Sequence, residues 1–373
     1  MRWVFWIAAA TIAYAYVGYP MWLWLRSRWS PRPVRRGAIE PTVSVVMVVR
    51  NEEEVLQRKL ENLLTLDYPA EKLEVVVVSD GSTDRTAAIL ERYAHHPKVQ
   101  VLLKQLPEGK AAGLNDAIKM ATGEIAMFTD ARQNIEAGAL RLAIENFADS
   151  AVGCVSGELM LGDPESGETE RGMGMYWLIE KKIRELESAS GSVAGATGAI
   201  YCARRELLFP LPDGTILDDV LLPMQIASRG GRVVFDSRAR AWDAANLGES
   251  REFGRKVRTL SGNYQLLQLA PWLLSSQNPI RFEFISHKLM RLAVPFALLA
   301  VFVASAFIAE PFYRAVLFTQ IVFYALSLTA LAGLRFGPLS RVADVARTFV
   351  VLNSAAMVAF VNFVTGRKAA WVR

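Results

Sequence analysis

A chain of 373 residues, 52% of them hydrophobic and 21% charged, is long enough for a soluble domain together with membrane-spanning segments. The net charge of +5 requires no nucleic-acid partner, because much of the excess lies beside apolar runs where anionic lipid attracts it. The two cysteines, Cys154 and Cys202, are too few for a disulfide framework and agree with a reducing compartment.

The N-terminal run from Trp3 to Leu25 contains no charged residue and is long enough to cross a bilayer core of roughly 30 Å. It is too long for a secretory signal peptide, and no small-residue cleavage pattern follows it. The residues after it are instead basic: Arg26, Arg28, Arg32, Arg35 and Arg36. This positive flank predicts a transmembrane helix over residues 1–26, a basic, proline-containing linker over 27–41, and a cytosolic domain after it.

Residues 42–264 alternate between apolar, β-branched runs and helical segments. Strands are predicted at Val43–Val49, Leu73–Ser79, Val99–Leu103 and Ile125–Thr129, with helices between them at Glu52–Leu64, Asp84–Tyr93 and Lys110–Ala121. This alternation predicts an α/β domain with a parallel sheet covered by helices on both faces. Ligands of such sheets bind at the carboxyl ends of the strands, so the polar residues directly after each strand are candidate site residues.

The C-terminal third predicts membrane contact. Residues 265–290 are apolar but too short and interrupted to span, which predicts interfacial helices. Three uncharged stretches then predict a transmembrane region over 291–373: Leu292–Ala309, Ala315–Leu334 and Thr348–Gly366. If all three cross, the basic C-terminus lies outside, against the positive-inside tendency, so full crossing by each stays open. The expected location is a bacterial inner membrane, as a multi-pass protein.

Polar residues follow three of the predicted strands. Asn51 and Glu52 come after the first, the segment from Asp80 to Asp84 after the second, and Asp130 after the fourth. Taken singly, each is also typical of a turn or a helix cap. Because parallel strands end at one edge of a sheet, their combination favours a binding site there.

These stretches resemble the membrane-bound inverting glycosyltransferases of family 2, which include the cellulose, chitin and hyaluronan synthases. The matching segments are 43–53, 75–84, 109–117, 121–131 and 217–222, and the resemblance covers about residues 41–260. It implies a GT-A type nucleotide-sugar-binding fold. It also implies a UDP-sugar donor and a membrane-associated acceptor, lipid-linked or glycan, close to membrane lipids.

The resemblance assigns the donor site to the strand ends. Asp80 falls where the family has an aspartate that contacts the nucleotide base. Asn51, Glu52 and Asp84 line the same loops, although the first two also suit helix caps. Lys110 falls where a basic residue approaches the donor and offsets phosphate charge; a solvated lysine at a helix start is the alternative.

A divalent metal is implied by Asp130, which matches the first aspartate of the family's Asp-any-Asp motif. Carboxylate oxygen suits Mg²⁺ or Mn²⁺ bridged to a diphosphate. The third position of the motif is Arg132 here, which departs from the pattern. Arg132 is itself able to offset diphosphate charge, so a metal-independent variant stays open.

The pair Asp218-Asp219 resembles the family's Glu-Asp pair, whose second residue is the general base. Asp219 is therefore assigned as the base that takes the acceptor's proton, with Asp218 supporting it. An N-cap of the predicted helix Val220–Arg229 is the alternative, and one residue is able to serve both roles. Thr197 and Gly198 lie in a small-residue loop that resembles the acceptor border of relatives, or an ordinary glycine turn.

The basic segment 255–259 occupies the place of the Gln-any-any-Arg-Trp motif of polymer-making relatives. Arg258 aligns with the arginine that covers the diphosphate, while membrane-surface charge is the alternative reading. Thr259 replaces the tryptophan that supports the growing sugar chain, and Trp242 or Trp272 is able to substitute for it. Transfer of one or a few sugars is therefore favoured over processive polysaccharide synthesis. A non-catalytic membrane sensor or transporter is the alternative of another class.

Overall fold

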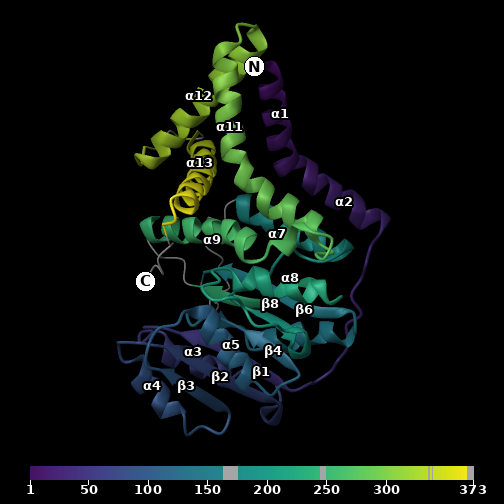
Figure 1. Ribbon diagram of the computed structural model, residues 1–373, viewed down its shortest axis with the longest axis vertical. Helices are drawn as coiled ribbons and strands as arrows, with labels where there is room; N and C mark the ends of the chain where they lie inside the picture. Colours follow the sequence, from purple (N-terminus) through teal and green to yellow (C-terminus); the bar gives the residue numbers. More distant parts are fainter. Residues whose placement is uncertain (163–174, 244–248, 335–336, 338, 368–373) are drawn as a thin grey trace.

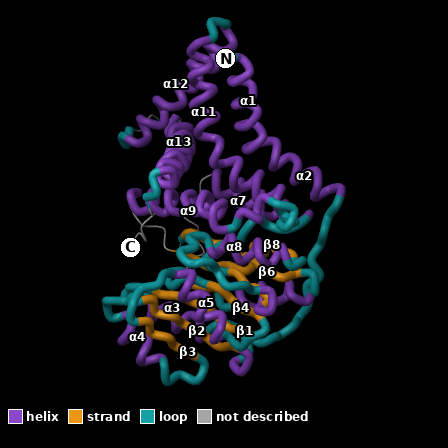
Figure 2. Tube along the Cα trace, viewed as in Figure 1, coloured by secondary structure: helices purple, strands orange, loops and turns teal. Residues whose placement is uncertain are grey.

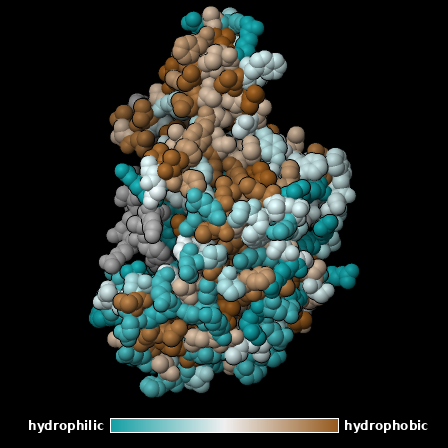
Figure 3. All heavy atoms as spheres, viewed as in Figure 1, coloured by the Kyte–Doolittle hydropathy of each residue, from teal (hydrophilic) through white to brown (hydrophobic). Residues whose placement is uncertain are grey.

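The computed structural model describes residues 1–162, 175–243, 249–334, 337 and 339–367. A domain built on a β-sheet forms one end of the molecule, and long helices form the other (Figures 1 and 2). Figure 3 shows that the surface of the helical end is largely hydrophobic, whereas hydrophilic residues predominate around the sheet. This division matches the predicted arrangement of a soluble domain attached to membrane helices.

An eight-stranded sheet, in the order β3-β2-β1-β4-β7-β6-β8-β5, organises the domain. Its strands are β1 (Val43–Val49), β2 (Leu73–Asp80), β3 (Val99–Lys104), β4 (Ile125–Phe128), β5 (Asn134–Ile135), β6 (Val152–Leu161), β7 (Tyr201–Arg204) and β8 (Arg232–Asp243). The first four are parallel, as predicted, but β7 runs antiparallel to both β4 and β6. The sheet is therefore mixed. β5 and β7 have only 2 and 4 residues, too few to give a detectable periodicity.

Helices cover both faces of the sheet, as the alternating sequence predicts. They are α3 (Leu56–Leu64), α4 (Thr86–Tyr93), α5 (Lys110–Met120), α6 (Ala139–Ile144), α7 (Met175–Ser190) and α8 (Asp218–Ser228). One apolar cluster joins α3, α4 and α6 to the sheet, and a second joins α5 and α8 to the opposite face. Every residue of β1 is buried, because this strand lies inside the sheet between the two clusters.

Among the described residues, four helical stretches are long and apolar enough to cross a membrane: Arg2–Trp29, Arg281–Phe307, Pro311–Leu331 and Leu339–Val364. The first comprises α1 (Arg2–Ala13) and α2 (Tyr19–Trp29), joined by a π-helical turn over Tyr14–Gly18. The others contain α10 (Arg281–Glu283) and α11 (Met290–Phe307), then α12 (Pro311–Leu331) and α13 (Leu339–Val364). One N-terminal and three C-terminal helices are thus confirmed. Residues 368–373 of the expected C-terminal region lie outside the described residues.

The expected boundary at residue 290 falls inside a continuous helical stretch, because a π-helical turn over Phe284–Leu289 joins α10 to α11. Polar side chains that interrupt the apolar pattern there find partners on other elements. His287 lies 2.9 Å from both Glu180 and Glu187 of α7, and Glu283 pairs with Arg26 of α2 at 2.5 Å. The two His287 contacts also connect the helical end to α7 of the sheet domain, whereas the Arg26–Glu283 pair joins two stretches of the helical end.

The helix α9 (Glu249–Leu269) lies between the sheet domain and the long helices (Figure 1). It packs against α13, and a 3₁₀ turn over Pro271–Leu274 follows it. From the end of α2, the linker descends along the side of the sheet domain to β1 (Figure 1).

Candidate active site

Four charged side chains converge where β4 ends and where α5 and α8 begin. Lys110 is the first residue of α5, Asp130 follows β4, and Asp218 and Asp219 form the first turn of α8. Lys110 Nζ lies 3.0 Å from Asp130 Oδ1 and 3.1 Å from Asp218 Oδ1. Burial opposes the charge on Lys110, but the surrounding carboxylates outweigh it and raise its pKa above the ordinary range.

The small-residue loop ahead of β7 holds Asp219 in place. The backbone N–H of Gly198 donates to Asp219 Oδ2 at 3.2 Å, and that of Ala196 donates to the Asp219 carbonyl at 2.7 Å. Burial and the neighbouring Asp218 carboxylate together raise the pKa of the Asp219 carboxyl. A carboxylate of raised pKa accepts a proton more readily, which suits a general base.

Gly198 keeps a gap open between two carboxylates. A Cβ atom at this position would lie 3.2 Å from Asp130 Oδ2 and 3.7 Å from Asp219 Oδ2. Asp130 is 42% exposed at its side chain, so its second oxygen remains accessible beside this gap. No group of three or more His, Cys, Asp or Glu side chains able to hold a metal occurs among the described residues. A Mg²⁺ or Mn²⁺ ion held by Asp130 would need phosphate oxygens of a ligand and water for the rest of its coordination.

Arg132 binds a carboxylate of this protein in the structure, whereas the sequence predicts that it offsets the charge of a diphosphate. Its Nη2 donates to Asp243 Oδ2 at 2.6 Å, and Gln133 Nε2 donates to the same oxygen at 2.9 Å. Asp243 is the last residue of β8 and is buried. Burial, followed by the charge of Arg132, lowers the pKa of Arg255 on α9, which places this second arginine near the same pair. Sequence reasoning missed Asp243, because nothing local connects it to a residue 111 positions away.

The residues predicted to contact the nucleotide base form hydrogen bonds between neighbouring loops. Asp80 is 1% exposed, and its two oxygens accept the backbone N–H groups of Glu108 and Gly109 at 2.7 and 2.9 Å. It therefore holds the loop that positions Lys110. Gly81 has φ +59°, and a Cβ there would lie 2.5 Å from the backbone nitrogen of Pro107, so this close approach requires glycine.

The loops after β1 and β2 are joined in the same way. Asn51, at φ 55°, accepts the backbone N–H of Thr83 at 2.8 Å. Asp84 accepts the N–H groups of Thr86 at 2.9 Å and Glu53 at 3.2 Å. Burial raises the pKa of Glu52, and the charge of Arg132 opposes that rise. The sheet edge thus brings the predicted donor-side residues together.

Two of the predicted residues lie at the border of this arrangement. The backbone N–H of Thr197 donates to Ser156 Oγ of β6 at 3.2 Å, which fixes the small-residue loop against the sheet. Arg258 lies half-buried on α9, one turn after Arg255. The basic segment of α9 thus extends from the Arg132–Asp243 pair toward the helical end of the molecule.

Lys59 is a second residue that sequence reasoning missed. It is 2% exposed on α3, and its Nζ donates to Thr129 Oγ1 at 2.8 Å and to the Gln133 carbonyl at 2.7 Å. It therefore braces both ends of the loop that carries Asp130. Burial lowers its pKa to about 7. A signal was present, because helical spacing places Lys59 on the same face as Leu56, Leu60 and Leu63.

The mixed sheet, with its nucleotide-side loops after parallel strands and its acidic pair at the start of α8, is the fold of GT-A glycosyltransferases. Residues 44–209 match the family model described as glycosyl transferase family 2, and the chain carries a domain of that family. The resemblance found in its motifs is therefore confirmed for the sheet domain.

Individual relatives agree with this assignment. The chain is 27% identical over 192 residues to a beta-monoglucosyldiacylglycerol synthase of Synechocystis sp., covering 50% of this chain and 40% of the relative. It is 24% identical over 234 residues to a poly-beta-1,6-N-acetyl-D-glucosamine synthase of Staphylococcus aureus, covering 60% of this chain and 55% of the relative. The chain thus spans about half the length of these curated relatives.

A solved structure extends the similarity to nearly the whole chain. It is the mannosyltransferase PcManGT from Pyrobaculum calidifontis, in complex with GDP-Man and Mn²⁺. The two chains are 26% identical and superpose with a TM-score of 0.72, covering 98% of this chain and 100% of the other. The likeness therefore includes the long helices as well as the sheet domain.

Proposed function

We propose that this protein is an inverting glycosyltransferase that moves a sugar from a nucleotide-sugar donor to an acceptor at the membrane surface. One observation carries the proposal. Asp219, with its raised pKa, stands beside the Lys110–Asp130–Asp218 cluster at the sheet edge, where the family has its base and its donor diphosphate. α8 and α9 lie on the side of the sheet domain that faces the membrane helices (Figure 1).

The chemistry follows from these positions. The acceptor hydroxyl oxygen attacks the anomeric carbon as the bond from that carbon to the diphosphate oxygen breaks on the opposite face, which inverts the configuration. Asp219 takes the hydroxyl proton, and the electron pair of the broken bond leaves with the nucleoside diphosphate. Lys110 holds Asp130 and Asp218 in position. When bound at Asp130, Mg²⁺ or Mn²⁺ offsets negative charge on the departing diphosphate.

The donor is proposed to be a UDP-sugar, with a GDP-sugar as the competing candidate because PcManGT was determined with GDP-Man. Purified full-length protein, supplied with membrane lipids, is to be incubated with radiolabelled UDP-glucose, UDP-N-acetylglucosamine and GDP-mannose. Label appearing in an acceptor from one donor supports transferase activity and names the nucleotide. Absence of both transfer and donor hydrolysis across the panel would instead favour a non-catalytic sensor.

Metal removal gives a first prediction. EDTA is expected to suppress transfer, and Mn²⁺ or Mg²⁺ to restore it. The protein is proposed to hold the metal through a single carboxylate, that of Asp130, so a chelator should remove the metal easily. Asp130→Ala is expected to abolish transfer or to raise the metal concentration needed for half-maximal rate. The measurement is the initial rate against free metal concentration. Full activity of Asp130→Ala in EDTA would contradict the proposed metal role.

The acceptor is proposed to be lipid-linked or membrane-proximal, with the sheet domain on the cytosolic side of a bacterial inner membrane. The basic flank after the first span supports this orientation. The lipid-glycosylating activity in the name of the Synechocystis relative supports a lipid acceptor. A glycan acceptor and processive polymer synthesis form the second candidate, because the S. aureus relative is named as a polysaccharide synthase.

Product length separates these two candidates. Trp242 is 5% exposed and donates its indole N–H to Glu136 at 2.7 Å, so its ring is not open to a sugar. Trp272 is half-buried against the apolar cluster of α5 and α8. Because neither of these two tryptophans presents an open ring face, we expect one or a few sugars per acceptor. Gel filtration of labelled product made with excess donor measures this, and early high-molecular-weight product with acceptor still abundant would favour the polymer synthase.

A further inference from the structure

A cavity of about 800 Å³ lies where the N-terminal membrane helix meets the sheet domain. Its walls come from the end of α2, the linker, the start of β8 and α10, and none of the candidate active-site residues lines it. Gly191, Gly230 and Gly231 form part of the wall, and a Cβ atom at Gly191 would lie 2.9 Å from Arg26 Nη2. The cavity is therefore separate from the proposed sugar-transfer site, and its role is independent of that proposal.

The cavity is positively charged. Arg26, Arg32, Arg35 and Arg232 line it against two carboxylates, Asp149 and Glu283, so four positive charges face two negative ones. Arg32 and Arg35 are exposed, and no side-chain ion pair of either occurs among the described residues. A net charge of two positive units is thus left for a ligand to neutralise.

At the inner end of the cavity, contacts with neighbouring groups hold the guanidinium groups of Arg26 and Arg232, which are hydrogen-bond donors. Arg26 Nη1 pairs with Glu283 at 2.5 Å and Nε donates to Ser190 Oγ at 3.0 Å, but Nη2 is buried with no acceptor among the described residues. Arg232 donates to the backbone carbonyls of Ser188 and Gly191, at 2.6 and 2.8 Å. Burial lowers the pKa of Arg232, which marks it as a partly desolvated cation.

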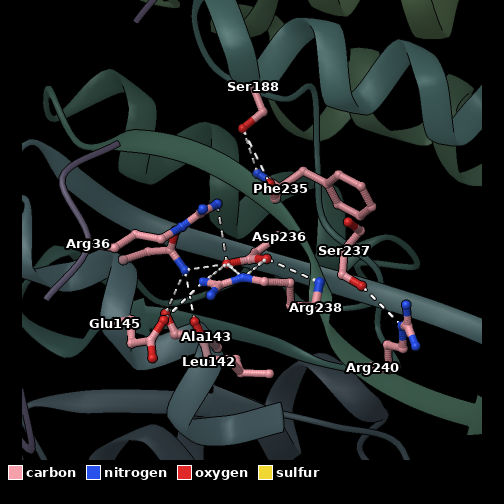
Figure 4. A network of polar contacts seen from close by, with 11 residues as sticks. Arg36, Leu142, Ala143, Glu145, Ser188, Phe235, Asp236, Ser237, Arg238 and Arg240 are labelled. Atoms are coloured by element: carbon pink, nitrogen blue, oxygen red, sulfur yellow. Dashed lines mark hydrogen bonds and ion pairs between the residues drawn. The ribbon is translucent and has the colours of Figure 1, made fainter. Parts of the chain in front are cut away.

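The linker is attached firmly enough to hold the remaining arginines beside the cavity. Arg36 lies 3.5 Å from Asp236 of β8, and Arg238 binds the same carboxylate at 2.8 Å (Figure 4). The backbone N–H of Arg35 donates to Asp149 at 3.3 Å. Asp236 therefore neutralises the charge of Arg36, whereas the side chain of Arg35 is able to bind a ligand in the cavity.

Two candidate membrane spans end at this cavity. Arg26 lies near the end of the span Arg2–Trp29, and Glu283 near the start of the span Arg281–Phe307. Trp22, Trp24 and Trp29 are exposed on the same part of α2, as aromatic residues are at the membrane–water boundary. In a membrane crossed by these two stretches, the cavity would lie near the lipid head groups.

We propose that this cavity binds the phosphate group of an anionic phospholipid. Arginine guanidinium groups bind phosphate oxygens through charge-assisted hydrogen bonds, and a net negative head group complements the excess of positive charge. A soluble phosphate ester shares this chemistry, but the cavity's position at the span ends favours the lipid. A bound lipid would join α2, the linker and β8, and so set how the sheet domain sits against the membrane.

The test measures binding to the purified full-length protein in a neutral detergent. Three soluble probes are titrated: short-chain phosphatidylglycerol, phosphatidylcholine with the same chains, and glycerol phosphate. Phosphatidylglycerol is expected to bind saturably, at least about tenfold more tightly than either other probe. The double variant Arg32→Gln/Arg35→Gln is expected to weaken it about fivefold for each arginine removed, or about 25-fold. Both side chains are exposed, so folding is preserved.

The matched control is the double variant Arg28→Gln/Arg92→Gln. It removes the same charge from exposed positions outside the cavity, and Arg28 lies on α2 over the ring of Trp24. This control is expected to bind phosphatidylglycerol within about twofold of the unchanged protein. Equal binding of the two lipids, or equal loss in the control, would overturn the proposal. Glycerol phosphate binding as tightly as phosphatidylglycerol would assign the cavity to a soluble phosphate instead.

Discussion

Asp219→Asn is expected to lower the rate of sugar transfer by about 10²–10⁴-fold, because the amide cannot accept the acceptor's proton. The substitution keeps the size of the side chain, and its carbonyl oxygen is still able to accept the backbone N–H of Gly198. Donor affinity should therefore survive. The measurements are initial rates with saturating donor and, separately, the dissociation constant of the nucleotide sugar by calorimetry.

Asp213→Asn is the matched control for this experiment. Asp213 is an exposed aspartate in the segment that leads to α8, so its loss removes the same charge without touching the site. We expect its transfer rate to remain within about twofold of the unchanged enzyme. Near-normal turnover of Asp219→Asn would move the general base elsewhere. A parallel loss of donor affinity would mean that Asp219 holds the donor rather than the acceptor's proton.

The pH dependence of the unchanged enzyme gives an independent readout. Burial and Asp218 raise the pKa of Asp219, and only the carboxylate form accepts a proton. The rate should therefore be full above this pKa and fall as the pH drops through it, at a higher pH than an ordinary aspartate would give. Asp219→Asn should lose this acidic limb from the small activity that remains.

Lys110→Met is the second change with a large expected effect. It removes the cation that lies within 3.1 Å of both Asp130 and Asp218, and Asp218 is 4% exposed. Loss of one partner leaves a buried carboxylate unpaired, which typically costs about 3–5 kcal/mol of folding free energy. We expect a lower unfolding midpoint in urea and a loss of transfer, since the position of Asp130 depends on the same contact.

Two further variants make this result interpretable. Lys104→Met is the control, because Lys104 also pairs with two carboxylates, Glu108 and Asp116, and its side chain is 10% exposed. We expect the control to lose some stability but to keep its transfer rate. Lys110→Arg keeps the charge and should restore folding while transfer stays impaired, because a guanidinium is larger and planar. Full activity of Lys110→Met would contradict a role for this contact in the site.

The sequence by itself determined the elements whose signals are local. The strand at Val43–Val49 is found as predicted, because a seven-residue, β-branched run between turn residues is typical of a buried strand. The predicted helix at 110–121 agrees with the observed helix Lys110–Met120, because the periodicity of the segment is also a local signal. Parallel strands end at one edge, so Asp130 was expected near the loops after the first two strands before any contact was known. The roles of Lys110 and Asp219 came from motif resemblance and remain proposals.

Only the tertiary structure decided the contacts between distant segments. Asp243 meets Arg132 because β8 and the loop after β4 reach the same place, and neither segment carries a local sign of the other. The buried polar contacts of Glu283 and His287 let a helical stretch begin at Arg281, where polar residues alone had indicated an interruption. The arginine-lined cavity likewise assembles from α2, the linker and β8. Each depends on which elements pack together, and hydrophobic periodicity reports only which face of an element is buried.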